Sequence, residues 1–156
     1  MKALKLALYV VFAFVITTSL ALAASNTFKA KITGKEEVPA VKTASTGNAV
    51  FTLSKDGKLI NYTLKVKGMA DVTAAHIHAG KMGAEGGVAV GLFAGPKKEG
   101  KFSGVLATGT IMDKDLVGPL AGKTLADLVT MIKGGGAYVN VHTAKNPKGE
   151  IRGQIK

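Results

Sequence analysis

The feature that most constrains the fold is a strict alternation of apolar and polar residues between positions 60 and 67. Every second position is apolar, namely Ile60, Tyr62, Leu64 and Val66. The intervening positions are polar or charged, namely Asn61, Thr63, Lys65 and Lys67. Because successive side chains of a strand point to opposite faces, this period of two predicts a β-strand with one buried and one solvated face. Such a strand is typical of antiparallel sheets.

Other segments with strand character are separated by glycine-rich turns. They cover residues 28–32, 47–54, 75–79, 88–93, 101–111, 137–143 and 150–156. One helix is also predicted, with Thr124 as its N-cap, Asp127 in its first turn and Gly134 at its end. Its apolar face consists of Leu125, Leu128, Val129 and Ile132. The chain is therefore predicted to be mainly β, with one short helix.

The first 23 residues have the pattern of a secretory signal peptide. Two lysines in Met1–Lys5 precede an uncharged apolar run from Leu6 to Leu22. Ala21-Leu22-Ala23 fits the small-residue cleavage pattern, which predicts a mature chain from Ala24 to Lys156. An uncleaved membrane anchor is the alternative, because the run approaches the length of a spanning helix. We expect a periplasmic or secreted protein with a single β domain over residues 24–156 and no stable membrane insertion after cleavage.

Composition excludes several classes of function. The chain has no cysteine, which rules out disulfides, a thiol nucleophile and a blue-copper thiolate site. Its net charge is +11, but the lysines are scattered along the sequence, so solubility is a better explanation than an anion-binding patch. Nucleic acid is not expected as a partner, because there is one arginine and no basic run interleaved with aromatic residues.

Three histidines occur in the chain, in two of the predicted strands. His76 and His78 are two positions apart and so share one face of their strand. His142 shares a face with Tyr138 and Asn140, opposite Val139 and Val141. In both strands the apolar residues are predicted to point to the core and the histidines outward. Three imidazoles brought together in this way form a candidate metal site.

The last two predicted strands form a hairpin around Asn146-Pro147-Lys148-Gly149. Glu150 and Arg152 fall on the face that carries His142. Because paired residues of an antiparallel ladder share a face, His142 should lie opposite or diagonal to Arg152 or Glu150. The single arginine is therefore predicted near the third histidine.

These motifs resemble the CHRD domain, which is named after chordin and also occurs alone in exported bacterial proteins. The resemblance is carried by residues 76–80, by Gly86-Gly87-Val88, and by residues 138–143 continuing through 147–155. It implies a β-rich domain that is immunoglobulin-like or barrel-like. It implies no particular biochemical activity.

A looser similarity is to copper-zinc superoxide dismutase, a Greek-key β-barrel with a His-x-His strand, a late histidine strand and an arginine near its copper. The present chain departs from that pattern, because it has no fourth histidine, no bridging histidine and no cysteine pair. Together the two resemblances imply an antiparallel Greek-key β-sandwich or barrel with one short helix.

Two hypotheses for the function follow. In the first, His76, His78 and His142 bind a single metal ion, with copper favoured and zinc as the alternative, since three nitrogens without a thiolate suit both. An open coordination position could take water, superoxide or peroxide, with Arg152 guiding an anion to it. In the second, the domain is a non-catalytic extracellular binding or adhesion module whose histidines are structural.

Met82 is a further candidate ligand. It follows His78 by four positions on a glycine-rich loop, and its thioether would favour cuprous copper. Simple packing of the loop is the stronger explanation for this residue.

Overall fold

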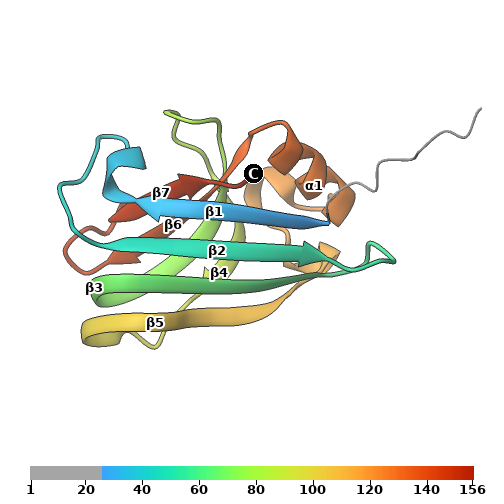
Figure 1. Ribbon diagram of the computed structural model, residues 1–156. Coiled ribbons are helices and arrows are strands. Elements are labelled where there is room, and N and C mark those ends of the chain that lie inside the picture. The colour runs from blue at the N-terminus through green and yellow to red at the C-terminus, as the bar shows by residue number, and fades with distance from the viewer. Residues whose placement is uncertain (1–25) are drawn as a thin grey trace, which may run out of the picture.

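The computed structural model describes residues 26–156 and is mainly β (Figure 1). Within that range the strands are β1 Thr27–Thr33, β2 Thr46–Leu53, β3 Ile60–Ala79, β4 Val88–Phe93, β5 Lys98–Ile111, β6 Ala137–Thr143 and β7 Ile151–Gln154. The helices are the 3-10 turns η1 Gly34–Glu36, η2 Asp113–Asp115 and η3 Gly118–Leu120, and α1 Leu125–Lys133. Each pairing between these strands is antiparallel. The predicted mainly β fold with one short α-helix is confirmed.

The long strand β3 joins the two parts of the sheet. Its first part pairs with β2 and β5, and its last part, from Val72 to Ala79, pairs with β6 and, near its end, with β4. Between them the register shifts near Gly68, whose φ is +70°, and Asp71, whose φ is +52°. Such irregularities bend a strand without ending its pairing. The prediction of separate strands over 60–67 and 75–79 is therefore wrong, because a bulge at a permissive glycine lets one bent strand cover both.

The sheet closes on itself and forms a barrel. The path runs from β1 through β2, β3, β6 and β7 and returns to β1. The closing contacts are the pairs Thr33 with Arg152 and Ala30 with Ile155. At Gly153 an added Cβ would lie 1.9 Å from the carbonyl oxygen of Lys31, so only glycine allows β1 and β7 this close together. The expected sandwich or barrel is thus a barrel.

The interior of the barrel is filled by the apolar faces that the alternation predicts. In β3 this face includes Ile60 and Leu64, both 0% exposed. Helix α1 lies beside β6 and buries its apolar stripe of Leu125, Leu128, Val129 and Ile132 (Figure 1). Thr124 caps it as predicted, by accepting a hydrogen bond from the Asp127 amide. The histidines lie on the other face of β3 and β6, which points away from the barrel interior.

The predicted signal peptide, residues 1–23, lies outside the described residues. Within residues 26–156, none of the helices has the length and apolar character needed to cross a membrane.

Candidate metal centre

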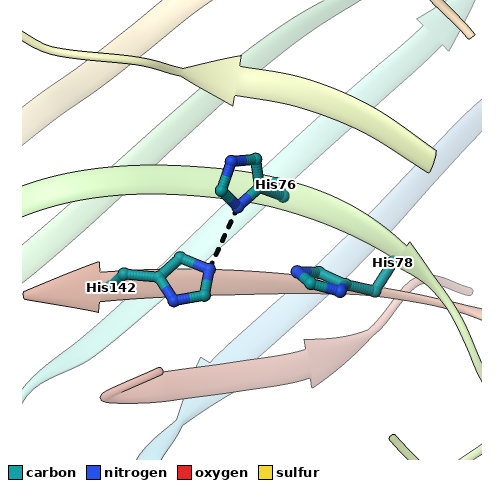
Figure 2. Close-up of side chains that lie close together, drawn as sticks. All are labelled: His76, His78 and His142. Carbon is teal, nitrogen blue, oxygen red and sulfur yellow. Dashed lines mark hydrogen bonds between the residues drawn. The ribbon is translucent and has the colours of Figure 1, made fainter. Parts of the chain in front are cut away.

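The three histidines come together where β3 runs beside β6 (Figure 2). The register pairs His76 with Asn140, which puts His142 diagonally across from His76 on the same face. One nitrogen from each imidazole lies within 4.8 Å of the other two. The closest pair is Nδ1 of His76 and Nε2 of His142, 3.0 Å apart. The predicted clustering of the histidines is therefore what the sheet produces.

Two backbone carbonyls orient two of the rings. Nδ1 of His78 lies 2.9 Å from the Gly86 oxygen, and Nδ1 of His142 lies 3.1 Å from the Pro147 oxygen. A carbonyl oxygen only accepts hydrogen bonds, so both Nδ1 atoms must carry the proton. Each Nε2 then carries a lone pair in place of a proton. Histidine ligands in metal sites are held in this way by an acceptor on the far nitrogen.

Nε2 of His78 is buried and has no hydrogen-bond partner among the described residues. A buried polar atom without a partner costs about 1–3 kcal/mol, and such atoms are uncommon. The atom belongs to the same cluster as the nitrogens of His76 and His142. With the proton on Nδ1, the lone pair of this Nε2 could serve as a ligand for an ion held by the cluster.

The histidine face is not an open surface, contrary to the expectation from alternation. His142 is only 8% exposed, whereas His76 and His78 are partly exposed. The turn that contains Pro147 and the loop that contains Gly86 both contact the rings. Alternation predicts which face a side chain takes, but not whether a loop will fold over that face.

Burial disfavours the protonated, positively charged form of all three imidazoles. It lowers the pKa of His76 to about 4, with further lowering by His142 and His78. Burial also lowers the pKa values of His78 and His142, more than their hydrogen bonds to Gly86 and Pro147 raise them. The three rings are consequently neutral at pH 7, which is the form that binds metal ions.

Arg152 lies next to this cluster but not on a free surface. Its pairing with Asn140 puts it diagonal to His142, as predicted. The side chain is 3% exposed, stacks over the Tyr138 ring with its guanidinium carbon 3.8 Å from the centroid, and donates to the Ala84 oxygen at 2.6 Å. The Tyr138 ring also stacks with His78, with the ring centroids 5.1 Å apart. Because β6 lies between β7 and β3, the tyrosine ring separates Arg152 from His78.

Glu37 is a site residue that the sequence analysis missed. Its Oε1 accepts a hydrogen bond of 2.5 Å from the Asn140 side chain, and it shares a cavity of about 260 Å³ with His78, Tyr138 and Arg152. Burial raises its pKa to about 7, although Arg152 and Asn140 act in the opposite direction. In the sequence Glu37 is one of two adjacent glutamates before a proline, and no local pattern distinguishes it from a surface residue.

Met82 lies apart from the cavity that His78 lines. It is 61% exposed and borders a different hollow, with Lys29 and Gln154 among the neighbouring residues. Glu150 was expected on the face that carries Arg152 and His142. Its carboxylate accepts hydrogen bonds from Thr43, Ser45, Thr143 and Asn146.

Comparison with known proteins agrees with the motifs. The family model described as the CHRD domain matches residues 28–155, which include both histidine strands and nearly the whole barrel. No curated protein and no solved structure matches the chain. With its barrel, its paired histidine strands and this match, the chain belongs to the CHRD domain family.

Proposed function

We propose that this CHRD domain binds a single metal ion through His76, His78 and His142. The observation that carries the proposal is Nε2 of His78, which is buried, unpartnered and directed to the same cluster as the other two histidines. A purely structural histidine in such a place would find a protein partner for both nitrogens. An ion would supply the missing partner for this atom.

The geometry needs only a small adjustment to hold an ion. Nitrogens bound to one zinc or copper ion at about 2.0–2.1 Å in tetrahedral geometry lie roughly 3.3 Å apart. The three nitrogens here all lie within 4.8 Å of one another, and the closest pair is at 3.0 Å. His78 and His142 are already held by Gly86 and Pro147, so a modest movement of the His76 ring would complete the site.

Copper is the favoured ion and zinc the alternative. The donors are three neutral imidazoles, which suit both ions, and copper(II) binds more tightly than zinc to a given set of nitrogen ligands. The metal would supply an open coordination position, on the more exposed side of the site at His76, for water or a small anion such as superoxide or peroxide. The buried Arg152 is better suited to holding Tyr138 and the loop at Ala84 than to guiding an anion.

We also propose that the protein acts in the periplasm or as a secreted protein. Support comes from the signal-peptide pattern of residues 1–23. In an exported protein, a site with three nitrogens and no thiol would not depend on a reducing environment.

The test is titration of chelator-stripped protein with zinc and copper(II) in the presence of a competing chromophoric chelator. We expect one ion per chain and tighter binding of copper than of zinc. Changing His78 to alanine should abolish tight binding, and circular dichroism should show that the variant is still folded. If the folded parent bound neither ion, the histidines would be structural and the domain a binding or adhesion module.

Met82→Leu is the matched control. It changes a methionine on the loop after His78 but keeps the apolar volume of the side chain. We expect affinities for copper and zinc equal to those of the parent, since Met82 borders another hollow. A selective loss of cuprous affinity would show that its thioether joins the site.

A further inference from the structure

One broad face of the barrel carries an ordered array of lysines. It is formed by the outward sides of β1, β2 and the first part of β3, which lie side by side in Figure 1. Four exposed lysines stand on it, here called the lysine face: Lys29, Lys31, Lys65 and Lys67. In the sequence these residues form two separated pairs, and only the sheet brings the pairs together.

The strand register determines how the lysines are spaced. Lys31 pairs with Asn48, and Asn48 pairs with Lys65, so the three residues form one row across the sheet. Adjacent strands are about 4.8 Å apart, which puts the backbones of Lys31 and Lys65 about 10 Å apart. Lys29 and Lys67 extend the array in the two opposite directions along the strands. The positive charge is therefore spread in two dimensions over the outside of these three strands.

No acidic side chain interrupts this array. β1, β2 and residues 60–70 of β3 contain neither aspartate nor glutamate. The ion pairs found among residues 26–156 join Lys97 to Asp71, at the bend of β3, and to Glu99 on β5. They leave the lysine face unpaired. The remaining outward positions are polar or small, among them Thr46, Asn48 and Thr52.

A hollow of about 630 Å³ borders the same face. Its lining includes Lys29 and Lys31 from the lysine face and adds Lys35 and Lys156. Thr33, Thr43, Ser45 and Thr46 line it as well, and Glu36 is its acidic lining residue. The hydroxyls of Thr43 and Ser45 donate to Glu150, which leaves those of Thr33 and Thr46 as donors for a ligand. Ammonium and hydroxyl donors around one hollow suit the oxygens of a phosphate group.

The chemistry of the face selects one kind of partner. Its charges are all lysines, which act as point charges and do not form the bidentate, planar contacts of arginine. The three strands of this face offer no exposed aromatic ring on which nucleic-acid bases could stack. A linear polyanion would follow one row of lysines, whereas a planar anionic surface would contact all of them at once. The face also lacks exposed large apolar side chains, apart from the half-buried Val50, so it would adsorb without inserting.

We propose that the lysine face is an adsorption surface for bilayers that contain anionic phospholipids, with the neighbouring hollow receiving a phosphate headgroup. The surface is separate from the histidine site, which lies on β3 beyond its bend and on β6. It does not depend on whether a metal is bound.

The test is co-sedimentation of the protein, without residues 1–23, with vesicles of one part phosphatidylglycerol to three parts phosphatidylcholine. We expect binding at low salt that weakens steeply toward 0.5 M salt, since the contacts are exposed charges. The double variant Lys31→Gln with Lys65→Gln should bind about thirty-fold more weakly, at roughly five-fold per lysine. Vesicles of phosphatidylcholine alone should not bind the parent.

The matched control is Lys114→Gln with Lys123→Gln, which removes the same charge from the connection between β5 and α1. We expect this variant to bind like the parent. Equal losses in the two double variants would mean that net charge alone drives binding and would overturn the proposal. It would also be overturned if the parent ignored the anionic vesicles, or bound dextran sulfate through the same lysines but not the vesicles.

Discussion

Nδ1 of His76 lies 3.0 Å from Nε2 of His142, although 66 positions separate the two residues in the sequence. His142 must keep its proton on Nδ1, which faces the Pro147 oxygen, so its Nε2 is the acceptor in this contact. Nδ1 of His76 is then the donor. The same two atoms that are hydrogen-bonded to each other in the metal-free protein are the ones that an ion would have to separate.

This relationship predicts which ring changes on metal binding. Zinc should convert His76 from its Nδ1-protonated to its Nε2-protonated tautomer, because Nδ1 becomes the ligand atom. His78 and His142 should keep their proton on Nδ1, which donates to Gly86 and Pro147. Long-range nitrogen–proton correlation spectra of the imidazoles, with and without zinc, measure all three rings. A tautomer change in His142 with none in His76 would contradict the arrangement.

Replacing His142 by alanine should destabilise the metal-free protein by about 1–3 kcal/mol. The change leaves the Pro147 oxygen without its donor and removes a side chain that is 8% exposed. His76→Ala should cost less, since that ring is partly exposed and gives up no backbone partner. Urea unfolding of both variants in the presence of a chelator measures the difference. Equal and negligible costs would mean that the His142 site is open to water in solution.

Glu37 should give the protein a recognisable dependence on pH. Its pKa is raised from 4.5 to about 7 in the fold, so between these values the folded state holds a proton that the unfolded state has lost. The stability contributed by this proton is fully present below pH 4.5 and is lost as pH rises through 7. The parent should therefore lose stability relative to Glu37→Gln over that window, as measured by urea unfolding at several pH values. A constant difference would show that Glu37 is ionised throughout.

Replacing Arg152 by glutamine should lower the stability by roughly 2–4 kcal/mol. The guanidinium is 3% exposed, stacked over Tyr138 and bonded to Ala84, and glutamine supplies neither the ring stacking nor the charge. Amide hydrogen exchange should speed up in the loop that contains Ala84. We expect the metal affinity to stay within about tenfold, or ~1.4 kcal/mol, because the contacts found for Arg152 are not to the candidate ligands. If the variant were as stable as the parent and its loop exchanged at the same rate, the guanidinium of the parent would not be holding the loop and would be available to a ligand.

The closure of the barrel can be tested at Gly153. An alanine Cβ there would lie 1.9 Å from the Lys31 oxygen, so Gly153→Ala must push β1 away from β7 and should cost about 3 kcal/mol or more. Gly91→Ala is the control, since it lies in a strand and has nothing within 4 Å of the added atom. Thermal unfolding of the two variants gives the comparison. A well-tolerated Gly153→Ala would mean that the strands are not in close contact.

Local patterns in the sequence were enough to predict the strands and the helix of this protein, and which residues lie on the same face of each. Alternation is a property of the strand backbone itself, so Ile60, Leu64, His76 and His78 could be assigned to faces without knowledge of their neighbours. Helix α1 and its cap at Thr124 were predictable for the same reason, because spacing and capping depend on residues within one or two turns. The histidine motifs were also sufficient for the family, which the match over residues 28–155 confirms.

What only the tertiary structure decided depends on contacts between distant segments. Three features leave no local signal in the sequence. They are the bend that joins residues 60–79 into one strand, the burial of His142 beneath a turn, and the position of Glu37 beside Asn140. The lysine face is the clearest case, since its residues alternate as ordinary solvated positions and become an array only when β1, β2 and β3 pair. Periodicity describes the direction of a side chain, whereas its surroundings are determined by strand register and loop packing, which are set by the free energy of the whole fold.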